Sequence, residues 1–415
     1  MDVLDTVLVT PRSNPSLLPA LEERIRKDFL PRWNDLWQGR FAVQGAQPGP
    51  NSVHLDGNDY LAVSGHPDIV RAQVAALTRS SNFAVQSSVF LHEEHPTRRL
   101  ELTLADWVGK DDGFVCQSGY AANVGLIQSV ANADTPVYLD GQAHASLWEG
   151  AHAARAPIQT FRHNDPQHLD KLMAKHGPGL VAVDSVYSTT GAVCPLADML
   201  EVVERHGGMI LVDESHSLGT HGPSGAGLCA QLGLTDRVHF ISASLAKAMA
   251  GRAGFFTAPA RLRYHILTSS FPNIFSSCVL PHEAAGLTAT VEVLKQGDAA
   301  RETLRCLTRR IRASLSDMGY PIAQGTEQII ALEAGPEPAT IQVRDELDAR
   351  GVHTAFFGAP ATARNRSLAR MTLHAALTEA ELAHVESAAK EVAELVKPWE
   401  WASARRQRLG GSQAS

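Results

Sequence analysis

The sequence has no long apolar run, no excess of basic residues and no closely spaced pair of cysteines. None of its apolar runs reaches the roughly 18 residues that a membrane-spanning helix needs. Its first residues lack the basic stretch followed by an apolar stretch that a secretory signal peptide requires. We therefore expect a cytoplasmic protein with no membrane partner.

Acidic residues outnumber basic residues in this chain. There are 37 Lys and Arg against 44 Asp and Glu, which gives a net charge of -7. A protein that binds nucleic acid through its phosphates is usually basic. Nucleic acid is therefore not expected as a partner.

The cysteines and histidines show no spacing typical of a metal site or a disulfide framework. His92 and His95 are three positions apart, whereas the H-E-x-x-H zinc motif needs four. The cysteines include no C-x-x-C pair, and they are Cys116, Cys194, Cys229, Cys278 and Cys306. The sequence therefore predicts a reduced protein without a metal.

The N-terminal part of the 415-residue chain is expected to be helical. At roughly 150 residues per domain, the length suggests two or three domains. Leu17, Leu21, Ile25 and Phe29 share one helical face, and Pro31 is expected to end this helix. We assign residues 1–57 to an N-terminal helical segment.

Short, continuous apolar runs alternate with helical stretches over residues 58–283. Continuous apolar strands separated by helices indicate a mostly parallel sheet that is covered on both faces. This predicts an α/β fold with a large domain at 58–283. The runs are Phe114–Cys116, Val137–Leu139, Leu180–Val183, Met209–Val212 and Val238–Ile241.

The pattern of apolar and polar residues changes after residue 283. Helical stretches dominate residues 284–400, with two strand candidates at Ile329–Leu332 and Leu368–Leu373. This predicts a smaller α+β C-terminal domain. Residues 401–415 end in GGSQAS and are expected to form a disordered tail.

Three groups with chemical potential follow predicted strands, where ligands collect in open α/β sheets. Asp213 leaves a buried strand, so its carboxylate needs a cationic partner such as a protonated pyridine nitrogen. Lys247 lies among small residues, and a lysine of lowered pKa can form a Schiff base. Gly119 begins a predicted helix whose free N–H groups can bind phosphate. Together they match the needs of pyridoxal phosphate.

Each of these signals also has a simpler structural explanation. Asp213 could cap a loop, and Lys247 could be a solvated surface residue. The Ser-Gly pair at 118–119 could only cap a helix. Their occurrence together, in this order, favours the cofactor site.

At this level of detail the sequence resembles the α-oxoamine synthases, which are fold-type I pyridoxal-phosphate enzymes. It is especially similar to the α-hydroxyketone quorum-sensing autoinducer synthases of the cholera type. The resemblance covers most of the chain. The motifs that carry it are NDYL at 58–61, QSGYAANVGL at 117–126, HASLWEG at 144–150, VDSVYSTTG at 183–191, LVDESHSLGTHGPSGAGL at 211–228, ASLAK at 243–247, IFSS at 274–277 and LARMTL at 368–373.

The resemblance implies roles for the residues in these motifs. Lys247 would hold the cofactor and move the α-proton, Asp213 would pair with the pyridinium, and His144 would stack on the ring. His216 and Ser188 would bind the phenolic oxygen. The phosphate would contact Ser118, Gly119, Tyr120 and Ser244, with Ser276 or Ser277 of a neighbouring subunit. Arg370 would bind the substrate carboxylate, and Asn58 and Tyr60 would line the substrate side.

Several of these roles have structural alternatives. His144 could be a core histidine, and Ser188 could only cap a turn. Arg370 could pair with a structural acid, and Tyr60 could be a packing residue. The sequence does not separate Ser276 from Ser277.

The chain departs from the broad family at two places. Thr97 stands where many members have a histidine, and Ser244 replaces the threonine of the usual Thr-x-x-Lys. The autoinducer synthases share this serine, which favours an amino substrate other than glycine.

The resemblance implies an acyltransferase that condenses a medium-chain acyl-CoA with S-adenosylmethionine or 2-aminobutyrate. The product would be an α-aminoketone precursor of an α-hydroxyketone signal, and the enzyme would be a homodimer. The alternatives are an ordinary α-oxoamine synthase, such as a glycine C-acetyltransferase or an 8-amino-7-oxononanoate synthase, and a fold-type I aminotransferase. A non-catalytic protein on the same scaffold is less favoured, because Lys247, Asp213 and His216 are intact.

Overall fold

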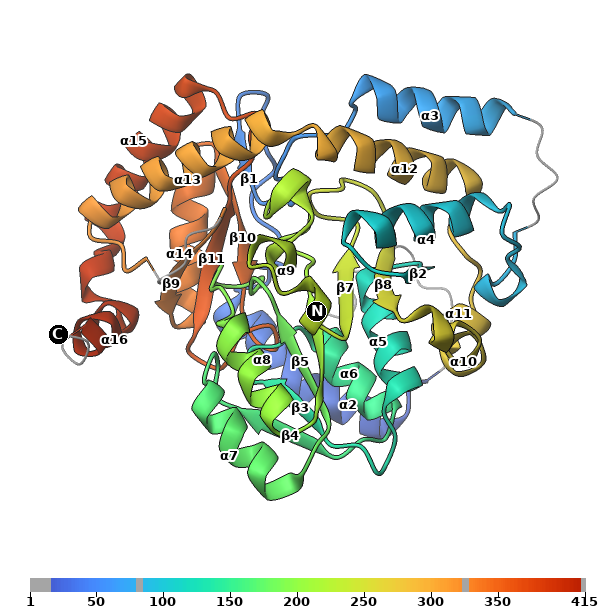
Figure 1. The fold of residues 1–415 in the computed structure, drawn as a ribbon. Coiled ribbons are helices and arrows are strands. Elements are labelled where there is room, and N and C mark those ends of the chain that lie inside the picture. The colour runs from blue at the N-terminus through green and yellow to red at the C-terminus, as the bar shows by residue number, and fades with distance from the viewer. Residues whose placement is uncertain (1–15, 80–84, 323–327, 412–415) are drawn as a thin grey trace.

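A seven-stranded, mostly parallel sheet forms the centre of the molecule. The computed structural model describes residues 16–79, 85–322 and 328–411 (Figure 1). The strand order is β2-β8-β7-β6-β5-β3-β4, and only β8 runs antiparallel to its neighbours. The strands are β2 (Asp112–Cys116), β3 (Val137–Asp140), β4 (Ile158–Phe161), β5 (Leu180–Asp184), β6 (Met209–Asp213), β7 (Phe240–Ser244) and β8 (Gly254–Ala258).

Helices cover both faces of this sheet, as its buried, apolar strands require (Figure 1). The α/β fold of the large domain is therefore confirmed. The helices of this domain are α3 (Pro67–Thr78), α4 (Pro96–Trp107), α5 (Gly119–Val130), α6 (Ala145–Ala153), α7 (Pro166–His176), α8 (Leu196–Arg205), α9 (Leu228–Gln231), α10 (Arg263–Ser269), α11 (Phe271–Ile274) and α12 (Pro281–Lys295).

A smaller mixed sheet of order β1-β10-β11-β9 lies beside the large one. Its first strand comes from the N-terminal segment, so the blue strand β1 in Figure 1 lies with the orange and red elements. The elements are β1 (Val53–Leu55), β9 (Ile329–Gly335), β10 (Val352–Phe357) and β11 (Ser367–Thr372), with helices α13 (Asp298–Asp317), α14 (Glu337–Asp348), α15 (Glu379–Val396) and α16 (Ala402–Gly411).

Two sequence-based expectations at the ends of the chain are wrong. Helical backbone continues past Pro31, as α2 (Pro19–Arg24) is followed by π-helical turns at Ile25–Phe29 and Arg32–Leu36. Wider turns of this kind accommodate a residue that cannot donate a hydrogen bond. In the expected tail, residues 402–411 form α16. This helix is attached to β9, because Ser403 Oγ donates to the carbonyl of Glu333 at 2.6 Å.

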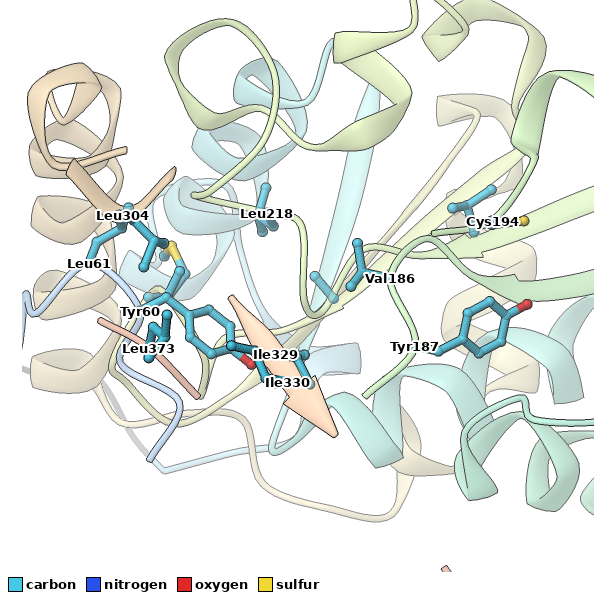
Figure 2. Packing of buried hydrophobic residues seen from close by; sticks show 14 of the residues in the cluster. Tyr60, Leu61, Val186, Tyr187, Cys194, Leu218, Leu304, Ile329, Ile330 and Leu373 are labelled. Atoms are coloured by element: carbon cyan, nitrogen blue, oxygen red, sulfur yellow. The ribbon is translucent and has the colours of Figure 1, made fainter. Parts of the chain in front are cut away.

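One buried apolar cluster continues from the large domain into the small domain. Figure 2 shows Val186 and Leu218 of the large domain in the same cluster as Ile329 and Leu373 of the small domain. The two sheets therefore share a core, and the edge between them is fixed by packing. None of the described helices is long and apolar enough to cross a membrane.

Candidate active site

Asp213 ends β6 at the carboxyl edge of the large sheet, and its side chain is 4% exposed. In the sheet register it lies between Asp184 of β5 and Ser242 of β7. Its Oδ1 accepts a hydrogen bond from the Ser215 amide at 2.9 Å, and its Oδ2 accepts one from Asn123 Nδ2 at 2.7 Å. The carboxylate is therefore held in one orientation.

Asn123 of α5 connects this carboxylate to a second part of the site. Its Nδ2 also donates to Ser146 Oγ at 2.8 Å, and its Oδ1 accepts from Ser242 Oγ at 2.5 Å. Ser146 Oγ in turn lies 2.7 Å from His144 Nδ1. Asp213 and His144 are thus the two ends of one hydrogen-bond chain, which is buried as far as Ser146 and exposed at His144.

His144 caps the N-terminus of α6, and its backbone amide is held by a buried acid. The amide donates to Asp184 Oδ2 at 3.0 Å, and Asp184 is 3% exposed. Burial, and then the charge of Asp213, raises the pKa of Asp184 well above its usual value. The Asp184 carboxyl therefore favours its protonated form.

Lys247 lies closer to the sheet than expected. Strand β7 continues to Ser244, where it pairs with β8, so Lys247 is three residues past the strand end (247 − 244). The apolar run that predicts this strand ends at Ile241, because the next three residues are small or polar. Burial lowers the pKa of Lys247, the charge of Arg370 lowers it further, and Asp213 raises it. The amine, the Asp213 carboxylate and the Arg370 guanidinium therefore share one electrostatic environment.

The start of α5 forms a concave backbone surface against β7. Ser118 is the N-cap, with its Oγ accepting from the Ala121 amide at 3.1 Å. A Cβ added to Gly119 would lie 2.6 Å from Ser244 Cβ, so no larger residue fits there. The amides of Gly119 and Tyr120 are in the first turn of α5, where helical N–H groups lack intrahelical acceptors.

The segment with Ser276 and Ser277 lies beside this turn within the same chain. The side chain of Gln117 donates to the Ser277 carbonyl, one position before Ser118. The Ser277 backbone thus lies beside the residue that precedes Ser118, and the contribution of either serine across a subunit boundary stays a prediction.

His216 follows Asp213 in the loop after β6 and is 4% exposed. Its Nδ1 lies 2.6 Å from the Tyr60 hydroxyl, and the same hydroxyl lies 3.2 Å from Asn58 Oδ1. Burial, followed by the charges of Lys247, Arg370 and His144, lowers the pKa of His216 well below its usual value. His216 is therefore neutral.

Arg370 comes from β11 and reaches the site from the small domain. It is 5% exposed and donates to the Ser188 carbonyl at 2.8 Å and to Asn58 Oδ1 at 3.2 Å. Its guanidinium carbon lies 4.6 Å from the centre of the Phe357 ring. Its Nε is buried without a hydrogen-bond partner among the described residues, so the cation keeps donor capacity for a ligand.

A cavity of about 650 Å³ opens between the two domains at this point. Tyr120, His144 and Ser188 line its large-domain side, and Phe357 with residues 360–363 lines its small-domain side. Of the expected site residues, Tyr120, His144 and Ser188 line this opening, and Arg370 reaches it through its hydrogen bond to the Ser188 carbonyl.

Sequence reasoning missed four residues that support the site: Asn123, Ser146, Asp184 and Ser215. All four lie within quoted motifs. Asn123 could have been found as a lone amide among apolar positions of a predicted helix. The roles of the other three depend on contacts between elements far apart in sequence.

Comparison with known proteins adds to this geometry. Residues 50–388 match the family model of class I and II aminotransferases. The chain is 41% identical to a CAI-1 autoinducer synthase of Vibrio campbellii over 349 residues, which cover 84% of this chain and 88% of that protein. It is 30% identical to an 8-amino-7-oxononanoate synthase of Anaeromyxobacter dehalogenans over 342 residues, covering 82% of this chain and 86% of that protein. The chain belongs to the α-oxoamine synthase family.

Solved structures agree with this assignment for the α-oxoamine synthase. A serine palmitoyltransferase variant from S. paucimobilis with a bound PLP–myriocin aldimine matches it with a TM-score of 0.82 and 25% identity, over 89% of this chain and 100% of that chain. A structure of SPT with PLP as an internal aldimine matches with a TM-score of 0.84 and 26% identity, over 92% and 100%. The protein is a fold-type I, pyridoxal-phosphate-dependent acyltransferase.

The residues of this α-oxoamine synthase fit its cofactor. A buried carboxylate stands at a strand end, a lysine of lowered pKa lies nearby, and Gly119 lets the first turn of α5 pack closely against Ser244. An acid, an amine and free helix N-terminal amides are the groups that pyridoxal phosphate requires.

Proposed function

We propose that this enzyme condenses a medium-chain acyl-CoA with an amino substrate such as S-adenosylmethionine or 2-aminobutyrate. The product is an α-aminoketone that serves as precursor of an α-hydroxyketone quorum-sensing signal. The observation that carries the proposal is the grouping of Lys247, Asp213 and Arg370 at one site in a chain 41% identical to a CAI-1 autoinducer synthase.

When bound, pyridoxal phosphate supplies an aldehyde for amines and a pyridinium ring that accepts an electron pair. Lys247 would hold this aldehyde, and its free amine would remove the proton from the substrate α-carbon. The lowered pKa of Lys247 supports this role, because more of the amine is unprotonated near neutral pH. Asp213 keeps the pyridine nitrogen protonated.

The small domain orients the substrate in this proposal. Arg370 binds the amino-acid carboxylate with its planar guanidinium, next to Asn58. The deprotonated α-carbon attacks the thioester carbon of the acyl-CoA, and the thiol of CoA leaves. The substrate carboxylate then leaves as CO₂.

The remaining assignments follow the same proposal. His144 stacks on the cofactor ring, and His216 and Ser188 bind its phenolic oxygen. The amides at Gly119 and Tyr120 bind the phosphate with the hydroxyls of Ser118 and Ser244. We further propose a cytoplasmic homodimer in which Ser276 or Ser277 of one subunit reaches the phosphate of the other.

The test combines colour with thiol release. The enzyme with cofactor should absorb visible light, and Lys247→Ala should lose that band and at least about 10³-fold in rate, the scale of a general acid–base contribution. Thiol release from acyl-CoA should require an amino substrate. A panel of acyl-CoA lengths and amino substrates, analysed by mass spectrometry, identifies the product.

A second candidate function is supported by the 30% identity to an 8-amino-7-oxononanoate synthase. An ordinary α-oxoamine synthase would release thiol with glycine or alanine and not with the larger amino substrates. Amino transfer to a keto acid without thiol release would instead identify an aminotransferase.

A further inference from the structure

Tyr60 connects the substrate-binding arginine to His216. Its hydroxyl lies 2.6 Å from His216 Nδ1 and 3.2 Å from Asn58 Oδ1, and the same Asn58 oxygen accepts from Arg370 Nη2 at 3.2 Å. The Tyr60 side chain is 1% exposed and belongs to the shared core shown in Figure 2. Packing therefore holds the hydroxyl in place.

The hydrogen bonds that link Arg370, Asn58, Tyr60 and His216 share a limited number of protons. Burial raises the pKa of Tyr60, against a smaller opposing effect of Arg370, so the hydroxyl keeps its single proton. Because Arg370 already donates to Asn58 Oδ1, the amide oxygen does not depend on Tyr60 for a partner. The shorter contact, to His216 Nδ1, is then the better place for the Tyr60 proton.

His216 has only one ring proton to place. The cations Lys247 and Arg370, together with His144, face it and add to the burial that keeps it neutral, while the anionic Asp213 lies three positions before it. A neutral imidazole has one donor nitrogen and one acceptor nitrogen. The partner of one nitrogen therefore decides the state of the other.

We propose that Tyr60 is a positioning residue that holds His216 in the tautomer protonated on Nε2. Tyr60 donates to Nδ1, and Nε2–H becomes the donor toward the phenolic oxygen of the cofactor. The opposite tautomer would present a lone pair to that electron-rich oxygen. This inference rests on the proposed role of His216 and changes the role expected for Tyr60 from lining the substrate to orienting a histidine.

The tautomer can be observed directly by NMR on cofactor-free protein with ¹⁵N-labelled histidine. The His216 signals are identified by their loss in His216→Asn. The wild type should show Nδ1 as the unprotonated nitrogen and Nε2 as the protonated one. Because this measurement needs no variant of Tyr60, it remains decisive even where such a variant does not fold.

Tyr60→Phe removes the donor and should produce a mixture of tautomers. It should also weaken cofactor binding by about tenfold, the scale of one lost hydrogen bond. Tyr320→Phe is the matched control. Its hydroxyl is also buried and donates to the Ala389 carbonyl at 2.8 Å, so its loss should leave His216 and the cofactor affinity unchanged.

Two results would overturn the inference. One is a wild-type His216 protonated on Nδ1, and the other is a Tyr60→Phe protein with an unaltered tautomer and cofactor affinity. Failure of the proposed acyl transfer is separate, because an enzyme that releases no thiol can still show the expected tautomer.

Discussion

At the large-domain side of the site, Asn123 uses both amide hydrogens and its oxygen in hydrogen bonds with Asp213, Ser146 and Ser242. At the small-domain side, the described part of the chain offers no hydrogen-bond partner to Arg370 Nε. We call the first group, with Asp184, the floor of the site. We call Arg370, Phe357 and residues 360–363 its wall.

The floor and the wall differ in how completely their polar groups are satisfied. A buried polar network with all its partners is rigid and holds its carboxylate in a set geometry. A buried cation with an unused donor instead favours an anionic ligand. We infer that the floor serves the cofactor chemistry and the wall selects the substrate.

Asp213→Asn should separate these roles with the largest effect. An amide cannot hold a proton on the pyridine nitrogen, and losing one member of a buried ion pair costs about 3–5 kcal/mol. We expect kcat to fall by roughly 100-fold or more, with little change in the KM of the amino substrate. Steady-state kinetics with saturating cofactor measures both. A change mainly in KM would contradict the division.

Arg370→Gln should give the opposite pattern, with a smaller effect. Losing charge-assisted hydrogen bonds worth about 1.5–3 kcal/mol should raise the KM of the amino substrate by roughly 10- to 100-fold. Arg310→Gln is the control, because Arg310 is a small-domain guanidinium bound to Glu386. An unchanged KM would remove Arg370 from the wall.

Arg370→Gln should also change the pH dependence of cofactor binding. Arg370 lowers the pKa of Lys247, so its removal lets that pKa rise. The rate at which added cofactor restores visible absorbance should then reach its half-maximum at a higher pH than in the wild type. An unchanged midpoint would show that the two cations do not interact.

Asp184→Asn should have the smallest effect on activity. It should show how much the buried Asp184 carboxyl reduces the stability of the folded protein as pH rises. The folded pKa of Asp184 is raised, so the folded state binds a proton that the unfolded state releases above pH about 4. The free energy of unfolding of the wild-type protein therefore falls as pH rises above this value, by up to about 1.4 kcal/mol per pH unit.

An asparagine keeps an oxygen for the His144 amide and does not titrate. The stability of Asp184→Asn relative to wild type should therefore increase between pH 5 and pH 8 in urea unfolding. Asp236→Asn, at an exposed acid, controls for the change in charge. A difference that does not vary with pH would mean that Asp184 is ionised in the folded protein.

The elements that the sequence predicted well are those with a strong local signal. The apolar cores of β2, β3, β5 and β6 were located, and the strand candidates Ile329–Leu332 and Leu368–Leu373 overlap β9 and β11. Strands β4 and β8 were missed, and without β8 the end of β7 was placed too early. Strand β1 was missed because its three residues become a strand only by pairing with β10, about 300 residues away in the chain.

By itself, the sequence determined the family, the cofactor and the order of the site residues, because these depend on residue type and local spacing. Only the tertiary structure decided that Asn123 joins Asp213 to His144, that Asp184 holds a backbone amide, and that Tyr60 faces His216. Those contacts join segments separated by many residues. Hydrogen bonds of a few ångströms between them are set by the packing of the two sheets and not by any local pattern.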